Sequence, residues 1–271
     1  KSQYEDTDSK EWKIWVIDNA SSDDSVKMVM KHFPEVEVIE SPVNVGFSAG
    51  NNLVRGRVVS EMVLFLNPDT IVPSGTIGEI YSQIESDATI GAITCRVELP
   101  DGNIDDSCHR GFPNPWNAVC HFSGLAKVFP SSRLFSGYTL GYKNLATRHE
   151  IDSLTGAFMM ITKRVADAAG WWDNDYFWNG EDLDFCFRIK KLGFKIIYDP
   201  SVKIIHYKGS SAGYKKTSHN QNVSKQIKLM AAKASTQAMR IFYEKHYKNA
   251  YPAIVWKVVM MGISVLEKKR I

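Results

Sequence analysis

The sequence lacks several features that would place it in a specialised class of protein. Its 271 residues include only four cysteines, with no CxxC pair and no adjoining pair of histidines. We therefore expect buried thiols in a reducing compartment, and neither a disulfide framework nor a zinc site. The opening residues show no basic patch followed by an apolar run, so we expect no secretory signal and a cytoplasmic location.

The composition is that of an ordinary globular protein. Hydrophobic residues make up 44% of the chain and charged residues 23%, which excludes a mostly disordered chain and a polytopic membrane protein. A length of 271 residues fits one large α/β unit, or one domain with an appendage.

Charge is distributed unevenly along the chain. Residues 1–184 hold 15 basic and 27 acidic residues, whereas residues 185–271 hold 18 basic and 3 acidic residues. The cationic part suggests a phosphate-bearing partner: a nucleic acid, an anionic lipid surface or a phosphorylated substrate. A solvated basic helix would explain the same pattern.

Apolar runs that predict strands alternate with segments that predict helices. The expected strands are 13–17, 36–39, 62–66, 90–97, 158–162, 195–198 and 202–207. The first expected helix follows the helix-start residues 21–24 and reaches about residue 33, and a Gly/Asn turn at 44–52 opens the next. The remaining expected helices are 74 onward, 163–169, 185–192, 219–246 and 253–269. Residues 100–150, rich in Gly, Pro, Ser and aromatics, predict a long irregular connection. This alternation predicts a mixed, mainly parallel sheet flanked by helices.

Two polar pairs follow expected strands, where ligands of such sheets bind. Asp18 and Asn19 follow the first strand and could bond a nucleotide, or could simply cap the next helix. Asp69, in Asn67-Pro68-Asp69, could hold a divalent metal, which prefers hard oxygen ligands. The alternative is a plain turn, because Asn-Pro marks turns.

Further along, three carboxylates lie beside a cluster of aromatic residues. Glu181, Asp182 and Asp184 could include a general base, because like charges near an apolar wall raise a carboxylate pKa. A helix N-terminus would also favour acidic residues there. His206 ends an expected strand and could be a metal ligand or a structural histidine.

The combination of these motifs resembles family-two glycosyltransferases, particularly the rhamnosyltransferase-like branch. The resemblance covers about residues 12–213 and rests on six blocks in the family's order. They are Val16-Ile17-Asp18-Asn19-Ala20-Ser21-Ser22-Asp23, Asn44-Val45-Gly46-Phe47 with Gly50-Asn51-Asn52, Phe65-Leu66-Asn67-Pro68-Asp69-Thr70, Thr155-Gly156-Ala157-Phe158, Gly180-Glu181-Asp182-Leu183-Asp184 and Ile205-His206-Tyr207.

The resemblance implies a GT-A fold, a nucleotide-sugar donor such as thymidine diphosphate rhamnose or a UDP-sugar, and Mg²⁺ or Mn²⁺. It also implies roles for single residues. Asp182 would be the general base of an inverting hexosyltransferase, and Asp69 and His206 would be the metal ligands. The residues that would contact the donor are Asp18, Asn19, Asn44, Asn67 and Asp69.

The sequence departs from the family pattern at two places. Asn67 replaces the commoner first acidic residue of a DxD motif, which suggests weaker metal affinity. The family also begins with a strand and helix before the segment that matches residues 13–18, whereas only the polar residues 1–11 stand there. We therefore expect an N-terminally incomplete glycosyltransferase domain over residues 1–213 and a basic helical extension over residues 214–271.

The basic extension fits an acceptor at a membrane. By resemblance, the acceptor is a glycan or a polyprenyl-diphosphate-linked glycan of cell-surface polysaccharide synthesis. Residues 250–266 are apolar but contain Lys257, and they fall short of the ~20 apolar residues that span a bilayer. An interfacial helix with Lys268, Lys269 and Arg270 near anionic headgroups would place the protein peripherally on the inner face of the plasma membrane.

Two other functions fit parts of the sequence. A non-catalytic nucleotide-sugar binding module, or an inactive fragment, would bind a nucleotide without transferring the sugar. A nucleic-acid binder could use the cationic part, but no recognised binding motif is present and the aromatics cluster in the acidic part. We therefore expect no nucleic-acid partner.

Overall fold

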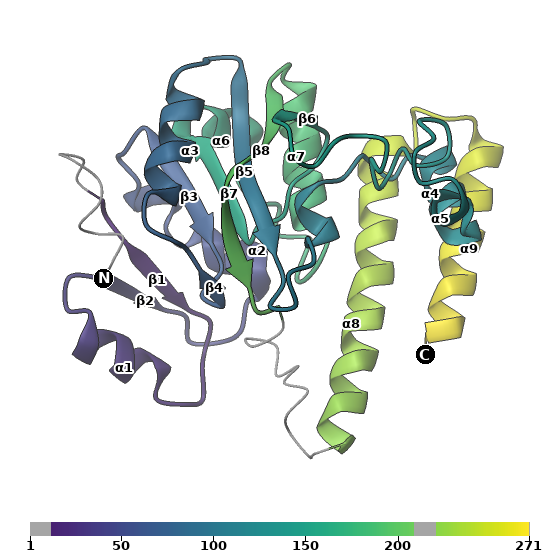
Figure 1. Cartoon of the computed structure of the whole chain (residues 1–271). Helices are drawn as coiled ribbons and strands as arrows, with labels where there is room; N and C mark the ends of the chain where they lie inside the picture. The colour runs from purple at the N-terminus through teal and green to yellow at the C-terminus, as the bar shows by residue number, and fades with distance from the viewer. Residues whose placement is uncertain (1–11, 209–220, 271) are drawn as a thin grey trace.

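The protein is built around a mixed β-sheet with helices on both faces (Figure 1). The computed structural model describes residues 12–208 and 221–270. In the main sheet the order is β3-β7-β5-β8-β4, and β6 also pairs with β8. The strands are β3 (Met62–Leu66), β4 (Thr70–Ile71), β5 (Ile90–Glu98), β6 (His149–Ile151), β7 (Phe158–Thr162) and β8 (Lys195–His206). The predicted fold class, a mixed sheet flanked by helices, is confirmed. Among the described residues of the main sheet, β5–β8 is the parallel pairing, whereas β3–β7, β5–β7, β4–β8 and β6–β8 are antiparallel, so the sheet is less parallel than expected.

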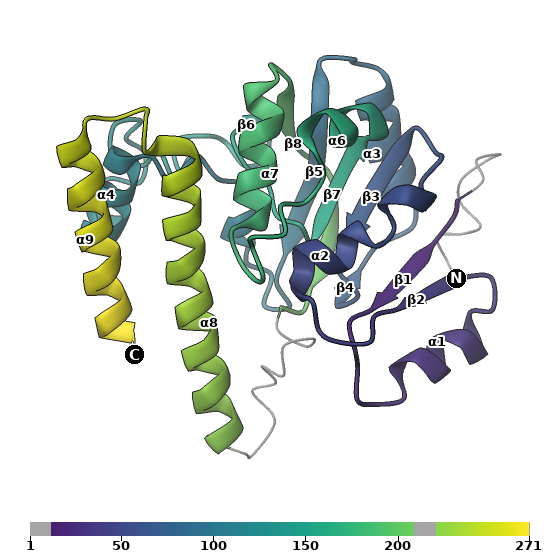
Figure 2. The ribbon, with the colours of Figure 1, turned by 180° about the vertical axis from the view of Figure 1, so that it is seen from behind.

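Helices cover the sheet from both sides, as Figures 1 and 2 show together. One face is covered by α3 (Thr76–Glu85), and the other by α2 (Gly46–Asn52), α6 (Lys163–Ala169) and α7 (Glu181–Lys191). β5 and β8 run parallel, as strand–helix alternation predicts. β7 is reached through the long connection and runs antiparallel to both of its neighbours, β3 and β5.

The first two strands form a small sheet of their own. β1 (Trp15–Asp18) and β2 (Glu37–Glu40) are parallel and are joined by α1 (Ser25–His32). Within the described ranges, β1 pairs only with β2, and β3 pairs only with β7. The expected absence of a strand before residue 13 concerns residues 1–11, which lie outside the described residues.

Three predicted segments differ from the structure. The two short strands expected at 195–198 and 202–207 form the single strand β8, whose register against β5 shifts at Asp199, next to Pro200. α7 begins at Glu181 instead of Phe185, because the acidic residues form its first turn. The connection expected to be irregular contains the 3₁₀ turn η2 (Asp106–Cys108) and two helices, α4 (Pro115–Ser123) and α5 (Leu125–Val128). Another 3₁₀ turn, η1 (Arg55–Arg57), lies earlier in the chain, between α2 and β3.

A helical unit lies beside the sheet (Figure 1). It consists of α4, α5, α8 (Gln221–Phe242), the π-helical turn η3 (Tyr243–Tyr247) and α9 (Ala253–Arg270). The predicted boundary between residues 213 and 214 lies outside the described residues. In the described part of the chain, none of the helices combines the length and apolar character needed to cross a bilayer.

Aromatic side chains fill the core between the sheet and α7. Phe65 on β3 packs edge-to-face against Trp171 and Trp172, with centroid distances of 6.0 and 4.9 Å, and Trp172 also contacts Phe185. Such pairs add about 0.5–1.5 kcal/mol each beyond the burial of their area. All four cysteines are buried and free, as predicted. This packing fixes the start of α7 against the sheet.

Candidate active site

Most of the predicted site residues line a single cavity of about 2300 Å³. Its lining includes the whole of β3, part of β1 and the end of β8. The carboxyl ends of strands are the place at which ligands of α/β sheets bind. The predicted residues that line it are Asn19, Asn67, Asp69, Asp182 and His206. Asp18 and Asn44 are not among the residues that line this cavity.

The polar groups after β1 bond to their own loop. The Asp18 carboxylate accepts a bond from the Ser21 amide, and the Asn44 side chain accepts one from the Gly46 amide. The Asn19 side chain makes two bonds: its Oδ1 accepts one of 2.8 Å from the Val45 amide, and its Nδ2 donates one of 3.0 Å to the Gly46 carbonyl. These bonds shape the loop around the cavity, so a nucleotide contact by Asp18 or Asn44 remains a prediction.

Gly46 lets two loops approach closely. Its φ is +84°, and a Cβ there would lie 2.5 Å from the Phe177 carbonyl oxygen. The next amide, of Phe47, donates a hydrogen bond of 2.9 Å to that oxygen. A side chain at position 46 would therefore push the aromatic segment before α7 away from α2.

Asp69 and His206 are brought together by antiparallel pairing of β4 with the end of β8. The His206 Nε2 lies 3.2 Å from Asp69 Oδ1, and its Nδ1 lies 3.4 Å from Asp105 Oδ2. Burial lowers the pKa of His206, but its bonds to Asp105 and Asp69 outweigh burial and raise the pKa to about 9. The site therefore favours positive charge beside Asp69.

Asp105, which contacts the Nδ1 of His206, was not singled out from the sequence. Its buried carboxylate accepts bonds from Ser107 and from Lys208, whose Nζ lies at 2.7 Å. These bonds to His206 and Lys208 outweigh burial and hold the pKa of Asp105 well below its usual range. Asp105 follows the turn at Asp101-Gly102, but nothing in the spacing predicts its contact with a residue 101 positions away.

Asp182 is positioned by an ion pair and by its own helix. Its Oδ2 lies 2.8 Å from Arg110 Nη2, and its Oδ1 accepts a 2.7 Å bond from the Leu183 amide. Both side chains of the ion pair are 13% exposed. A change in the rotamer of Asp182 would therefore leave the largely buried Arg110 guanidinium without its carboxylate partner. Arg110 comes from the long connection, where the sequence gave no signal of its role.

Glu181 lies beside Asp182 but makes different contacts. Its side chain lines the cavity, and its Oε2 has no hydrogen-bond partner among the described residues. Burial, followed by the charge of Asp182, raises the pKa of Glu181 to about 8. The surroundings of Glu181 therefore favour its protonated form, which can donate a hydrogen bond, over the carboxylate that a general base requires.

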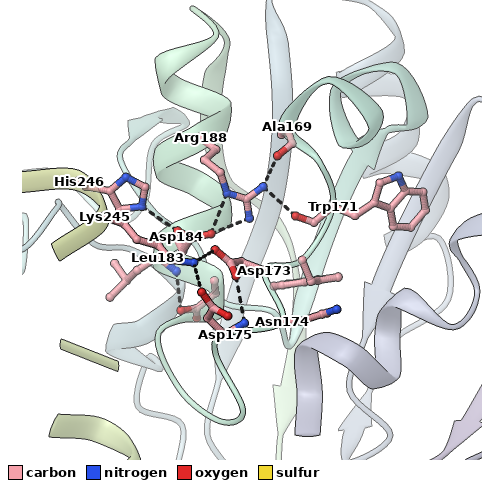
Figure 3. A network of polar contacts seen from close by, with 12 residues as sticks. Ala169, Trp171, Asp173, Asn174, Asp175, Leu183, Asp184, Arg188, Lys245 and His246 are labelled. Atoms are coloured by element: carbon pink, nitrogen blue, oxygen red, sulfur yellow. Dashed lines mark hydrogen bonds and ion pairs between the residues drawn. The ribbon is translucent and has the colours of Figure 1, made fainter. Parts of the chain in front are cut away.

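Asp184, the third carboxylate of the cluster, faces away from this chemistry. It is fully buried and is bonded to Arg188 and to His246 of η3, with Nε2 of His246 at 2.7 Å (Figure 3). Lys245 pairs with Asp173 and Asp175 in the same network. These contacts connect the helical unit to the aromatic segment that precedes α7.

The profile of glycosyl transferase family 2 matches residues 1–163, well over half of the chain. The chain belongs to glycosyl transferase family 2. Within this family it is 23% identical over 217 residues to an N-acetylglucosaminyl-diphospho-decaprenol L-rhamnosyltransferase of Mycobacterium tuberculosis (strain ATCC 25618 / H37Rv), covering 76% of this chain and 70% of the relative. Rhamnosyltransferase WbbL of Escherichia coli (strain K12) is 25% identical, with 74% of each chain covered. The predicted resemblance is therefore confirmed.

Solved structures confirm the GT-A type of fold. A mannosyltransferase from Pyrobaculum calidifontis in complex with GDP-Man and Mn²⁺ aligns with a TM-score of 0.52 at 15% identity, covering 95% of this chain. GalNAc-T7 with UDP, GalNAc and Mn²⁺ aligns with the same score and identity over 72% of this chain. This chain spans 63% and 37% of the lengths of those two proteins.

Proposed function

We propose that the protein is an inverting glycosyltransferase that moves a hexose, with rhamnose as the first candidate, from a nucleoside diphosphate to a lipid-linked glycan. The observation that carries this proposal is the presence of the Asp69–His206 pair and Asp182 on one cavity. The rhamnosyltransferase relatives support the choice of sugar, and the name of one of them supports a polyprenyl-diphosphate acceptor.

Asp69 and His206 fit a divalent cation. A carboxylate oxygen and an imidazole nitrogen face each other there, and the raised pKa of His206 means that the surroundings already stabilise one positive charge. Bound Mg²⁺ or Mn²⁺ would replace the imidazolium proton and stabilise charge on the leaving diphosphate. The described residues hold no cluster of three or more protein ligands, so donor phosphate oxygens and water would complete the shell.

In the proposed reaction, one side chain takes up a proton and others hold the reacting groups in place. Asp182 accepts the proton of the acceptor hydroxyl as that oxygen forms a bond to the anomeric carbon from the face opposite the diphosphate. The bond from this carbon to the diphosphate oxygen breaks with its electron pair, so the sugar is inverted. Arg110 keeps the Asp182 carboxylate oriented, and Asp105, whose Oδ2 lies 3.4 Å from His206 Nδ1, keeps the imidazole oriented.

The experiment is thermal-shift binding of uridine and thymidine diphosphates with and without Mn²⁺. We expect Mn²⁺-dependent stabilisation of the wild type, because a ligand that binds only the folded state raises Tm. Asp69→Ala should lose the Mn²⁺-dependent part. Glu40→Ala, which removes an exposed carboxylate at the end of β2, is the matched control and should keep it.

An unchanged Mn²⁺ dependence in Asp69→Ala would contradict the assignment of Asp69. Nucleotide binding by the wild type, together with no transfer to any lipid-linked acceptor, would favour the non-catalytic binding module instead. The size of the shift with each nucleotide would identify the base of the donor.

A further inference from the structure

The cavity continues beyond the carboxylates into an apolar groove between helices. On one side of this groove lies α4, and on the other lie α8 and α9, which are neighbours of α4 in Figures 1 and 2. We call it the α4–α9 groove. It is defined by Ala118, Val119, Phe122, Val258, Gly262 and Leu266.

The lining of the groove is apolar but open to solvent. Val119, Phe122 and Val258 are 52%, 44% and 53% exposed. Single exposed apolar residues are common, but apolar residues gathered along one concave surface mark a binding site. The groove therefore offers apolar area that an occupant would remove from water.

The groove leads to cations and to the proposed general base. Arg110, Lys208 and Asp182 line the same cavity as the apolar residues. Both cations are paired, Arg110 with Asp182 and Lys208 with Asp105, but the Lys208 side chain is 53% exposed, so its ammonium group can also meet an anion in the cavity. A ligand with an apolar chain and an anionic head would match this order of surfaces.

We infer that the α4–α9 groove binds the hydrocarbon chain of the lipid-linked acceptor. The acceptor diphosphate then lies near Lys208, and the glycan hydroxyl reaches Asp182. This inference rests on the proposed function, since it names where that function's acceptor binds. It adds a lipid-binding role for α4, a segment that the sequence predicted to be irregular.

Gly262 provides a way to fill the groove without disturbing the fold. It lies within α9 and lines the groove, and a Cβ built there meets no atom within 4 Å. A side chain at this position would project into open space, and replacing a helical glycine usually favours the helix. Gly262→Phe should therefore fold and obstruct the groove. Met261→Phe, at a neighbouring position that is 63% exposed and does not line the groove, is the matched control.

The test is photo-crosslinking of the purified protein with a diazirine-bearing polyprenyl diphosphate in detergent, followed by peptide mapping. We expect labelling of peptides from α4 and α9. We also expect probe affinity to fall about tenfold or more in Gly262→Phe and to stay unchanged in Met261→Phe. Labelling confined to other helices, or equal affinity in both variants, would overturn the inference.

A second pair of variants tests the opposite wall. Val119→Asp places a charge in the groove at an exposed position, whereas Val128→Asp places one on α5 outside it. Only Val119→Asp should weaken the probe. Retained probe binding by Val119→Asp and Gly262→Phe together would count against the groove.

Transfer assays separate this inference from the proposed function. Gly262→Phe should raise KM for a long-chain acceptor about tenfold and leave kcat and the donor KM unchanged. A short-chain acceptor should be used equally well by both proteins. If the wild-type protein binds the probe in the groove but transfers no sugar, the proposed function alone is contradicted. If the protein transfers sugar but does not bind the probe in the groove, this inference alone is contradicted.

Discussion

Glu181 and Asp182 are adjacent residues whose carboxyl groups lie in different surroundings. Glu181 is buried without a hydrogen-bond partner for Oε2, whereas Asp182 is paired with Arg110. Two neighbouring carboxyl groups in unlike surroundings are a common arrangement at acid–base sites. In the proposed mechanism Asp182 is therefore the base, whereas the surroundings of Glu181 favour its protonated form.

This division predicts opposite effects of two amide substitutions on transfer. Asp182→Asn should lose about 10²–10⁴-fold in kcat, the usual contribution of a positioned base, while nucleotide binding is kept. Glu181→Gln resembles the protonated carboxyl group, so kcat at pH 7 should stay within a few fold of the wild type. Equal losses in the two variants, measured with the same donor and acceptor, would refute the division.

Glu181 also makes stability depend on pH. Its pKa is raised from 4.5 to about 8 in the folded protein, so between these values the folded state binds more protons than the unfolded state. Stability must then fall as pH rises through this window. The Tm of Glu181→Gln relative to wild type should therefore increase from pH 5 to pH 8, whereas Glu40→Gln at an exposed position should show no such trend.

At the scale of elements, the contact between η3 and α7 holds the helical unit to the sheet. Asp184 in the first turn of α7 is fully buried, and His246 supplies one of its partners (Figure 3). Gly180, with φ of +83°, lets α8 approach this turn, because a Cβ there would lie 2.9 Å from Ala238 Cβ. The helical unit therefore supports the turn that carries Asp182.

We expect His246→Ala to lower the free energy of unfolding by about 1–3 kcal/mol, since it leaves a buried carboxylate oxygen without its partner. Urea denaturation of the full chain measures this loss. His32→Ala, at an exposed position in the last turn of α1, should change stability little. If both variants unfolded at the same urea concentration, the contact would have no role in stability.

Local signals explain why some elements were predictable. β3 matches its predicted bounds, which are those of the apolar run 62–66. α6 also matches, because Thr162 caps it and Gly170 ends it in the left-handed conformation. The same kinds of signal surround α4, with Asn114 as its cap and Gly124 at its end. They were obscured by the irregular composition of the surrounding connection.

Long-range contacts explain what was not predictable at the site. Asp69 and His206 follow apolar strands, so their shared place at one edge of the sheet could be inferred. Arg110 and Asp105 reach the site from a connection that folds back over 72 and 101 residues to meet Asp182 and His206. No local pattern specifies such a return, because it depends on how the connection packs.

For the whole molecule, the helical unit presents apolar and cationic side chains together. Ile254, Met261 and Trp116 are 67%, 63% and 47% exposed, and α9 ends in Lys268, Lys269 and Arg270. Such a combination of exposed apolar and basic side chains suits the surface of an anionic membrane, where apolar side chains enter the interface and cations meet the headgroups. Peripheral binding would bring a lipid-linked acceptor within reach of α9.

We expect the protein to co-sediment with vesicles containing anionic lipid at low salt, and to dissociate as salt rises. Each cation near such a surface contributes about 1 kcal/mol, so replacing Lys268, Lys269 and Arg270 by Glu should weaken binding at least ~100-fold. Replacing Lys27, Lys31 and Arg57 by Glu is the control, because these exposed residues lie in α1 and η1, outside the helical unit. Equal loss in both triple variants would indicate attraction by net charge without an oriented face.

The burial of the four cysteines has a practical consequence for measuring motion in this protein. Alkylating reagents attack the thiolate, and burial raises the pKa of Cys108 and Cys186 to about 12. Cys95 and Cys120 are also completely shielded from solvent. The native cysteines should therefore react little with maleimides, so that an introduced cysteine is labelled selectively. A spin label or fluorophore can be placed at one introduced cysteine on α9 and another on α4, and the distance between these helices followed during turnover.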